Sequence, residues 1–270
     1  MDYYKYIFVI LVYRNTHDLE ECLESIKEKV PSYKTIVVNA YYDDSTKHEV
    51  ESIANDNNCD FINIDNKGYS YGNNVGIEYA RNNYLYDYVV ISNPDILIEK
   101  FDDTFISADF KYDIIAPNII AASGKAQNPA MFKRLPFAEY LIYCGYKKSS
   151  KLFLMCGLAI SKIVRVFISN IKKIRKQHVY DIYCAHGSFL LLSKKIVESL
   201  KPVYDDRLFL FGEEGILAYK ARKAGFKTCF TDFISIKHKE DGSMKLSDLS
   251  INGEMKKSNI FYYENYIKSK

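Results

Sequence analysis

Short apolar strands alternate with helical segments along the first 95 residues, and this alternation restricts the fold more than any other feature. Residues 6–12 and 35–38 are apolar and rich in β-branched side chains, which predicts two buried strands, and residues 61–64 and 88–92 are predicted as a third, short strand and a fourth strand. Helical spacing follows the first strand and ends at Pro31. Strands that alternate with helices form βαβ units, so we predict an α/β fold with a mostly parallel central sheet flanked by helices.

The fourth strand ends at Asn93-Pro94-Asp95, where parallel sheets bind their ligands. A carboxylate there can hold Mg²⁺ or Mn²⁺, and the cation would offset the negative charge of a diphosphate leaving group. The structural alternative is a turn that closes the strand. Gly68, Gly72 and Gly76 lie upstream in a loop that runs into a helix, where the backbone can approach an anion closely.

Charge is distributed unevenly along the 270 residues. Residues 133–178 hold eleven Lys or Arg and one acid, Glu139, which gives this stretch a net charge of +10 and the remainder −7. At helical spacing, residues 151–176 place Ile160, Ile163, Val164, Phe167, Ile171 and Ile174 on one face and Lys162, Arg165, Ser169, Lys172, Lys173 and Lys176 on the other. The uncharged run is shorter than the ~20 residues that span a bilayer.

This basic amphipathic segment has three interpretations. A membrane-surface helix would lay its cations against anionic lipid. A helix packed on the core would leave its basic face in water. Nucleic-acid binding is disfavoured, because no aromatic side chains are interleaved with the cations for base stacking.

The six cysteines form no CxxC pair, which excludes a zinc ribbon and indicates free thiols in a reducing cytosol. The apolar run at the start is short and lacks a cleavage site, so we expect a buried strand rather than a signal peptide. We predict a cytoplasmic protein. If the basic helix binds lipid, the protein would be peripherally attached to the inner face of the cell membrane. We expect one domain over residues 1–245, with a helical insertion at about 133–178, and a Tyr-rich helical tail over 246–270.

Six blocks of sequence, in the same order, resemble the family 2 glycosyltransferases of the GT-A fold, and within them the rhamnosyltransferase-like branch. The resemblance covers residues 5–245. The blocks are VILVYRNTHDLEECLESI, VVNAYYDDST, NKGYSYGNNVGIEYA, VVISNPDILIE, AHGSFLLLSKKIVESL with its continuation YDDRLFLFGEEGILAYKARKAGF, and ISIKHKEDGS.

The resemblance implies that loops beyond the strands hold the nucleotide and the substrates. The residues that it assigns to these loops are Val12, Tyr13, Arg14, Asn15, Asn39, Asp44, Asn66, Gly68, Asn73 (or Asn74), Asn93, His186 and Gly187. For two positions a structural role is an open alternative: Asp44, with Asp43, can cap the next helix, and His186 can be a structural histidine.

The resemblance also implies the chemistry. Asp95 would hold the Mg²⁺ or Mn²⁺, and His238, which is followed by Gly242 and Ser243 in the family pattern, would approach the metal or the diphosphate. Inverting transfer needs a base for the attacking hydroxyl, and Glu214 occupies the family's position, with Glu213 and Asp206 as fallbacks. The two glutamates can also complement the dipole of a helix that begins there.

The sequence departs from the family pattern at four positions. Asn39 and Asn93 replace acids, so the D-x-D motif keeps only its second carboxylate, Asp95. Glu214 replaces an aspartate, and Ile216 replaces a further acid. The departures at Glu214 and Ile216 keep a second hypothesis open, in which a non-catalytic glycosyltransferase-like subunit recruits a partner to the membrane through the basic helix.

We predict an inverting, metal-dependent glycosyltransferase that moves a sugar from a nucleotide-diphosphate sugar to a saccharide or lipid-linked acceptor. The enzyme would be a hexosyltransferase that acts in cell-surface polysaccharide synthesis. The branch of the family that the sequence resembles suggests rhamnose as the sugar. A third hypothesis, a dinucleotide-dependent oxidoreductase, is disfavoured because G-x-G-x-x-G is absent after the first strand.

Overall fold

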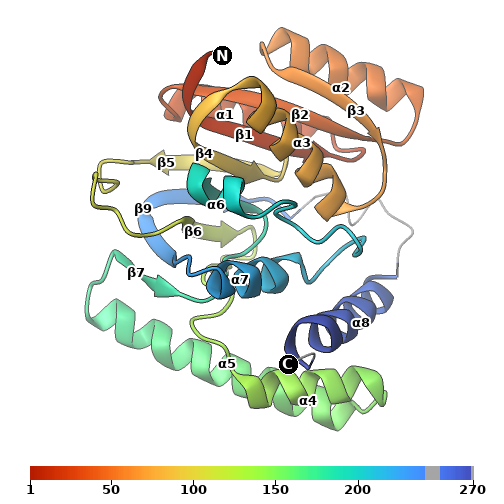
Figure 1. Ribbon diagram of the computed structural model, residues 1–270, viewed down its shortest axis with the longest axis vertical. Coiled ribbons are helices and arrows are strands. Elements are labelled where there is room, and N and C mark those ends of the chain that lie inside the picture. The colour runs from red at the N-terminus through yellow and green to blue at the C-terminus, as the bar shows by residue number, and fades with distance from the viewer. Residues whose placement is uncertain (241–249, 269–270) are drawn as a thin grey trace.

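A computed structural model describes residues 1–240 and 250–268 of the chain (Figure 1). The strands are β1 (Tyr3–Val12), β2 (Tyr33–Tyr41), β3 (Asp60–Asp65), β4 (Leu85–Ser92), β5 (Ile96–Phe101), β6 (Ile114–Ala121), β7 (Val179–Ile182), β8 (Phe189–Ser193) and β9 (Thr228–His238). The helices are α1 (His17–Lys29), α2 (Asp44–Asp56), α3 (Tyr69–Asn83), α4 (Pro136–Lys147), α5 (Lys151–Ile174), α6 (Lys194–Ser199), α7 (Glu213–Lys223), α8 (Ile251–Tyr262) and the π-helical turn η1 (Tyr263–Ile267).

The strands form one sheet in the order β3-β2-β1-β4-β8-β6-β9-β5, with β7 added on β9. The four strands predicted from the sequence are mutually parallel and make up one half of the sheet. In the other half, β8 runs antiparallel to β4 and β6, and β9 runs antiparallel to β5. The α/β fold with a mostly parallel centre is confirmed, and the mixed half holds the five strands that the sequence interpretation had not delimited.

Alternating side chains of β1 divide the core between the two faces of the sheet. Tyr6, Phe8 and Ile10 face a cluster that includes the apolar sides of α1 and α2. Ile7 and Val9 face a second cluster with α3, α6 and α7. Because both faces are covered by helices, the inner strands are apolar in successive residues rather than in alternate ones.

The insertion forms a helical hairpin, α4 and α5, at the end of the molecule opposite α2 and β3 (Figure 1). α8 packs against α4. The helical wheel of α5 is rotated from its expected setting: Arg165 faces the protein and donates to main-chain carbonyls, whereas Ile163 is 67% and Phe167 65% exposed. Much of the apolar face therefore points outward.

Helix α5 has 24 residues and lies within the predicted segment 151–176, but it passes the length and composition test for a membrane span that the short uncharged run was expected to fail. Among the described residues, it is the one helix whose length and composition would let it cross a membrane. Lys162 and Arg165 interrupt the apolar sequence of α5 near its middle. One side of the helix also packs on α4, and Arg165 bonds to the main chain of Ala126.

Candidate active site

The sheet topology brings Asp95 and His238 together. Asp95 lies just beyond β4, His238 is the last residue of β9, and β5 pairs with β9 so that Ile96 lies opposite His238. Both side chains are buried, Asp95 being 3% exposed, and the Nε2 atom of His238 lies 3.2 Å from Oδ1 of Asp95. Two residues that are 143 positions apart in the sequence thus form one buried pair.

Gln127 sets the orientation of the His238 ring. Its Oε1 lies 2.8 Å from Nδ1 of His238, and its amide nitrogen donates to Glu240. Because the amide oxygen accepts, Nδ1 carries the hydrogen in the neutral ring, and the lone pair of Nε2 then faces the Asp95 carboxylate. Two electron-rich atoms at this distance require a proton or a metal ion between them or beside them.

The donor set fits a divalent cation that also binds phosphate. One carboxylate and one imidazole supply two ligands, and the described part of the chain offers no cluster of three His, Cys, Asp or Glu. Where only one or two protein side chains bind such a cation, its other ligands are substrate phosphates and water. The pair is therefore suited to a metal that arrives with a diphosphate.

Tyr69 connects Asn93, two residues before Asp95, to Gly187 and through it to the predicted base. Its buried hydroxyl lies 2.9 Å from the carbonyl oxygen of Gly187 and 3.2 Å from Oδ1 of Asn93. The amide of Gly187 donates to Oε1 of Glu214, 3.3 Å away. A Cβ at position 187 would meet this oxygen at 3.0 Å, so glycine allows the close approach. Burial raises the pKa of Tyr69 well above its usual value, which keeps the hydroxyl protonated.

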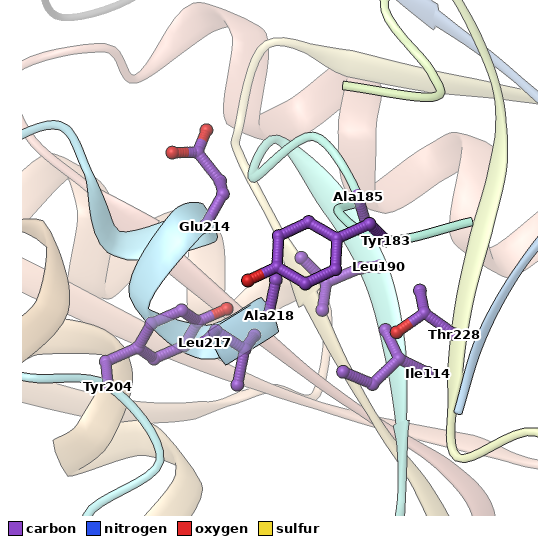
Figure 2. Close-up of a pocket in the computed structure, with 9 residues that line it drawn as sticks. All are labelled: Ile114, Tyr183, Ala185, Leu190, Tyr204, Glu214, Leu217, Ala218 and Thr228. Carbon is purple, nitrogen blue, oxygen red and sulfur yellow. The ribbon is translucent and has the colours of Figure 1, made fainter. Parts of the chain in front are cut away.

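Glu213 and Glu214 begin α7 and differ in their surroundings. Glu213 is buried, and its Oε2 has no hydrogen-bond partner among the described residues. Burial, followed by the charge of Glu214, raises the pKa of Glu213 well above its usual value. Figure 2 shows the Glu214 carboxylate pointing away from Tyr204 and Leu217. The raised pKa favours the protonated form of Glu213, so the two adjacent acids are suited to different roles.

His186 lies close to His238 of the Asp95–His238 pair. Its ring centroid is 6.0 Å from that of His238, and its Nδ1 lies 2.9 Å from Oγ of Ser188. Asn128 accepts a hydrogen bond from the His186 amide. Burial lowers the pKa of His186, which favours the neutral imidazole.

The loops after β1 and β2 meet through aromatic and cationic side chains. The Arg14 guanidinium lies 3.9 Å from the Tyr42 ring centroid, and the Tyr13 and Tyr42 rings are 5.9 Å apart. Val12 is buried at the end of β1. Asn15 bonds to Asp18 in the first turn of α1. These contacts bring the predicted nucleotide residues of the two loops together.

Asn39 and Asp44 lie at the end of β2 and the start of α2. Asn39 is fully buried and donates to Asn63, and its Oδ1 has no partner among the described residues. The capping role belongs to Asp43, whose carboxylate accepts from the Thr46 amide, while Asp44 accepts from Tyr41. Asp44 is therefore available for a role other than capping.

The two candidate asparagines of the glycine-rich block, Asn73 and Asn74, make different hydrogen bonds. Asn74 donates to and accepts from the main chain of Tyr204, which ties α3 to a distant loop. Asn73 bonds within its own helix, and its buried Oδ1 has no partner in the described residues. Asn66 accepts from the Gly68 amide and shapes the turn. Asn74 has a structural role, and Asn73 keeps an acceptor for a ligand.

Two predicted features lie elsewhere. Asp206 is exposed, and the hydrogen bonds around it belong to its buried neighbour Asp205, which pairs with Arg207 and Tyr266. The described residues give Asp206 no contact with Glu214, which weakens it as a fallback base. Gly242 and Ser243 lie outside the described residues.

Sequence reasoning missed Gln127, Asn128 and Tyr69. The first two lie in an irregular segment after β6, where no period or motif signals a role. Tyr69 stands inside the glycine block, and only the fold shows that its hydroxyl reaches residues 93 and 187.

Comparison with known proteins defines the class. The sequence profile described as glycosyl transferase family 2 matches residues 7–152, which is more than half of the chain. The chain belongs to this family.

A curated relative is the low-salt glycan biosynthesis hexosyltransferase Agl10 of Haloferax volcanii, 24% identical over 208 residues, which are 76% of this chain and 58% of the relative. The chain thus spans less than two thirds of that protein's length. This relative and the family match support a glycosyltransferase, and the comparisons give no support to a non-catalytic subunit.

Solved structures establish the fold. The chain superposes on S. aureus TarS 1–349 in complex with UDP-GlcNAc with a TM-score of 0.57, at 13% identity over 91% of this chain and 62% of that one. GalNAc-T7 with UDP, GalNAc and Mn²⁺ gives 0.61, at 13% identity over 97% and 48%. The fold is the GT-A fold of these neighbours, as the sequence blocks predicted.

Gly68 offers a test of the backbone at the glycine loop. Its φ is +103°, and a Cβ there would lie 2.3 Å from the carbonyl oxygen of Phe209. Because both the dihedral and the contact involve backbone, Gly68→Ala should destabilise the fold by about 2–4 kcal/mol. Urea unfolding measures this, with Gly124→Ala as the control, since Gly124 also has positive φ but has open space around it. Equal losses in the two variants would show that the Phe209 contact is unimportant.

Glu213 predicts a pH dependence of stability. Its folded-state pKa is raised, so its contribution is complete below the unfolded pKa and is lost as pH rises through the folded pKa. Glu213→Gln should therefore flatten the decline of the melting temperature as the pH rises above the unfolded pKa of a glutamate, about 4.3. The exposed Glu20→Gln is the control and should decline like the wild type. A Glu213→Gln curve parallel to the wild type would contradict a neutral buried Glu213.

Proposed function

We propose that the protein is an inverting, metal-dependent glycosyltransferase that uses a nucleotide-diphosphate sugar as donor. The observation that carries the proposal is a chain of hydrogen bonds that runs from Asn93, two residues before Asp95 of the Asp95–His238 pair, through Tyr69 and Gly187 to Glu214. Residues that could hold a phosphate-binding metal are connected in this way to a candidate proton acceptor, which matches the two requirements of glycosyl transfer.

The chain's residues divide the reaction between them. Asp95 and His238 would hold the cation, which supplies Lewis-acid stabilisation to the departing diphosphate when it is bound. The acceptor hydroxyl forms a bond to the anomeric carbon as the bond from that carbon to the phosphate oxygen breaks. Glu214 accepts the hydroxyl proton, and the nucleoside diphosphate leaves with the electron pair. Attack from the face opposite the leaving group inverts the anomeric centre.

Glu214 is the better base of the two adjacent acids. Burial raises the pKa of Glu213, which favours its protonated form and makes it the poorer proton acceptor. Glu214 is held at Oε1 by the Gly187 amide, and its carboxylate borders a pocket open to an acceptor. The extra methylene relative to aspartate is accommodated because residue 187 has no side chain.

The donor is an expectation from similarity. The two neighbours named above were solved with UDP or UDP-GlcNAc, so a uridine diphosphate sugar is the first donor to test. Rhamnose is suggested by the branch that the sequence resembles. The proposed setting is glycan biosynthesis on the cytoplasmic side of the membrane, with a saccharide or lipid-linked acceptor.

Donor turnover tests this function. We expect the protein to release nucleoside diphosphate from one member of a panel of nucleotide sugars, at a rate that rises when Mn²⁺ is added and an acceptor is present. Chelation should abolish release. Absence of release across uridine, deoxythymidine and guanosine diphosphate sugars, with and without metal, would contradict the proposal.

The α4–α5 hairpin supports attachment to a membrane. Its outward apolar residues, which include Phe137, Leu152, Met155, Ile163, Phe167 and Ile174, are each more than half exposed. Lys147, Lys148, Lys151, Lys162, Lys173, Arg175 and Lys176 surround them. An apolar face bordered by cations is complementary to an anionic lipid surface, and the predicted helix over residues 151–176 is thus the proposed contact.

Vesicle binding tests this contact. Ile163→Glu/Phe167→Glu places two carboxylates on the outward face and should reduce binding to anionic vesicles by about 100-fold or more. Co-sedimentation with phosphatidylcholine vesicles that contain or lack phosphatidylglycerol measures the effect. A matched double change on α2, Glu49→Gln/Glu51→Gln, should leave binding intact. Equal binding of the wild type to both vesicle types would contradict the electrostatic part of the proposal.

A further inference from the structure

A cavity of about 330 Å³ lies between the helical hairpin, α8 and the start of α7. Ile142 of α4, Val164 of α5, Met255 and Tyr262 of α8 contribute apolar surface, and Glu214 forms part of its wall. The volume is in the range of small-molecule sites. The predicted base therefore borders an apolar pocket whose lining does not include Asp95 or His238.

Arg165 supplies a cation to this pocket. Its guanidinium donates to the carbonyl oxygens of Ala126 at 2.7 Å and Gln127 at 3.0 Å. Within residues 1–240 and 250–268, no carboxylate lies in ion-pair distance of it, whereas the other acid in the wall, Glu139, is paired with Arg134. A half-buried guanidinium without a carboxylate partner is suited to an anionic group of a ligand.

Two further facts restrict the ligand. The pocket is walled by α4 and α5, the same helices that carry the outward apolar and basic face. Arg165 is also connected to the metal-site pair, because Gln127, whose carbonyl it contacts, bonds to His238. A ligand in the pocket thus reaches from the hairpin to the predicted base, which is the path of an acceptor.

We propose that this pocket binds the apolar chain of an anionic amphiphilic acceptor, with its phosphate or carboxylate at Arg165 and its hydroxyl-bearing part at Glu214. The proposal deepens the proposed function, on which the identity of the ligand as acceptor rests. Burial of the chain would supply affinity, and the charge at Arg165 would fix the direction in which the acceptor enters.

Binding of short amphiphiles to the full chain tests the pocket without any turnover. The probes are n-alkyl phosphates, carboxylates and alcohols of roughly four to ten carbons, below their micelle concentrations, measured by calorimetry. Each added methylene should tighten binding by up to about fourfold until the pocket is full. The alkyl phosphate should bind about tenfold or more tightly than the alcohol of equal length. Inorganic phosphate alone should bind weakly.

Two variants separate the apolar and anionic parts. Val164→Trp fills the pocket and should abolish binding of both phosphate and alcohol, whereas Val166→Trp, on the outward side of α5 and 51% exposed, should leave it unchanged. Arg165→Gln keeps a donor for the carbonyls and should remove the preference for the anion while leaving alcohol binding intact. Melting temperatures near the wild type show that the variants fold.

The outcomes are distinguishable from failure of the proposed function. Asp95→Asn should lose metal-dependent nucleotide binding and keep alkyl phosphate binding. Affinity that is independent of chain length, or that is lost in Val166→Trp and retained in Val164→Trp, would place the amphiphile on the outer face and overturn the pocket. An unchanged phosphate preference in Arg165→Gln would overturn the assignment of Arg165.

Discussion

Asp95→Asn should reduce nucleoside diphosphate affinity in the presence of Mn²⁺ by about 100-fold. Transfer should fall by about 10²–10³-fold, because the leaving diphosphate loses the charge that the cation stabilises. The amide keeps the shape of the buried side chain beside His238, so the fold should be preserved. Isothermal titration with UDP, with and without Mn²⁺, measures the first effect.

Two further variants serve as comparisons for the loss of affinity in Asp95→Asn. Asp109→Asn changes an exposed carboxylate away from the site and should behave as wild type. Gln127→Leu removes the partner of the His238 Nδ1 atom and should cost about 10-fold in metal-dependent affinity, as outer-shell changes do. If Asp95→Asn binds UDP with Mn²⁺ as tightly as the wild type does, the cation is held elsewhere.

Glu214→Gln is expected to lower the rate of transfer by about 10²–10⁴-fold, the usual contribution of a positioned general base. Nucleotide binding should be unaffected, since the glutamine oxygen can still accept from the Gly187 amide and the metal-site pair is untouched. The rate constant under saturating donor and acceptor is the quantity to compare.

The adjacent Glu213→Gln is the matched control, since it makes the same change one residue away. A neutral Glu213 resembles glutamine in charge, so this variant should retain most of the activity. If Glu213→Gln is the inactive variant and Glu214→Gln the active one, the roles are reversed. If both are active, the base is another group and the catalytic assignment is wrong.

The parallel half of the sheet could be predicted because its inner strands, β1, β2 and β4, are buried on both faces and therefore apolar in sequence. The mixed half was harder: β7 and β8 are only four and five residues long, and β9 bends where its register with β6 shifts. Short strands carry little periodic signal. Helix α5 was found in sequence, but its rotation about its own axis depends on contacts of Arg165 with residues 126 and 127.

Within the site, motifs identified the positions and the fold supplied the partners. Asp95 was singled out as a carboxylate at a strand end, and His238 as a companion from the family pattern. Their contact arises from the pairing of β5 with β9, which no local pattern encodes. Gln127 and Tyr69 act through distant residues, so their roles follow only from the tertiary structure.

The most direct test of the central claim is a thermal-shift measurement with UDP-sugars and related nucleotide sugars, each with and without Mn²⁺. The account predicts that at least one nucleotide sugar raises the melting temperature of the wild type, that Mn²⁺ is needed for most of the shift, and that Asp95→Asn loses it. A shift of equal size with and without Mn²⁺, or one that survives in Asp95→Asn, would contradict a donor site built on the Asp95–His238 pair.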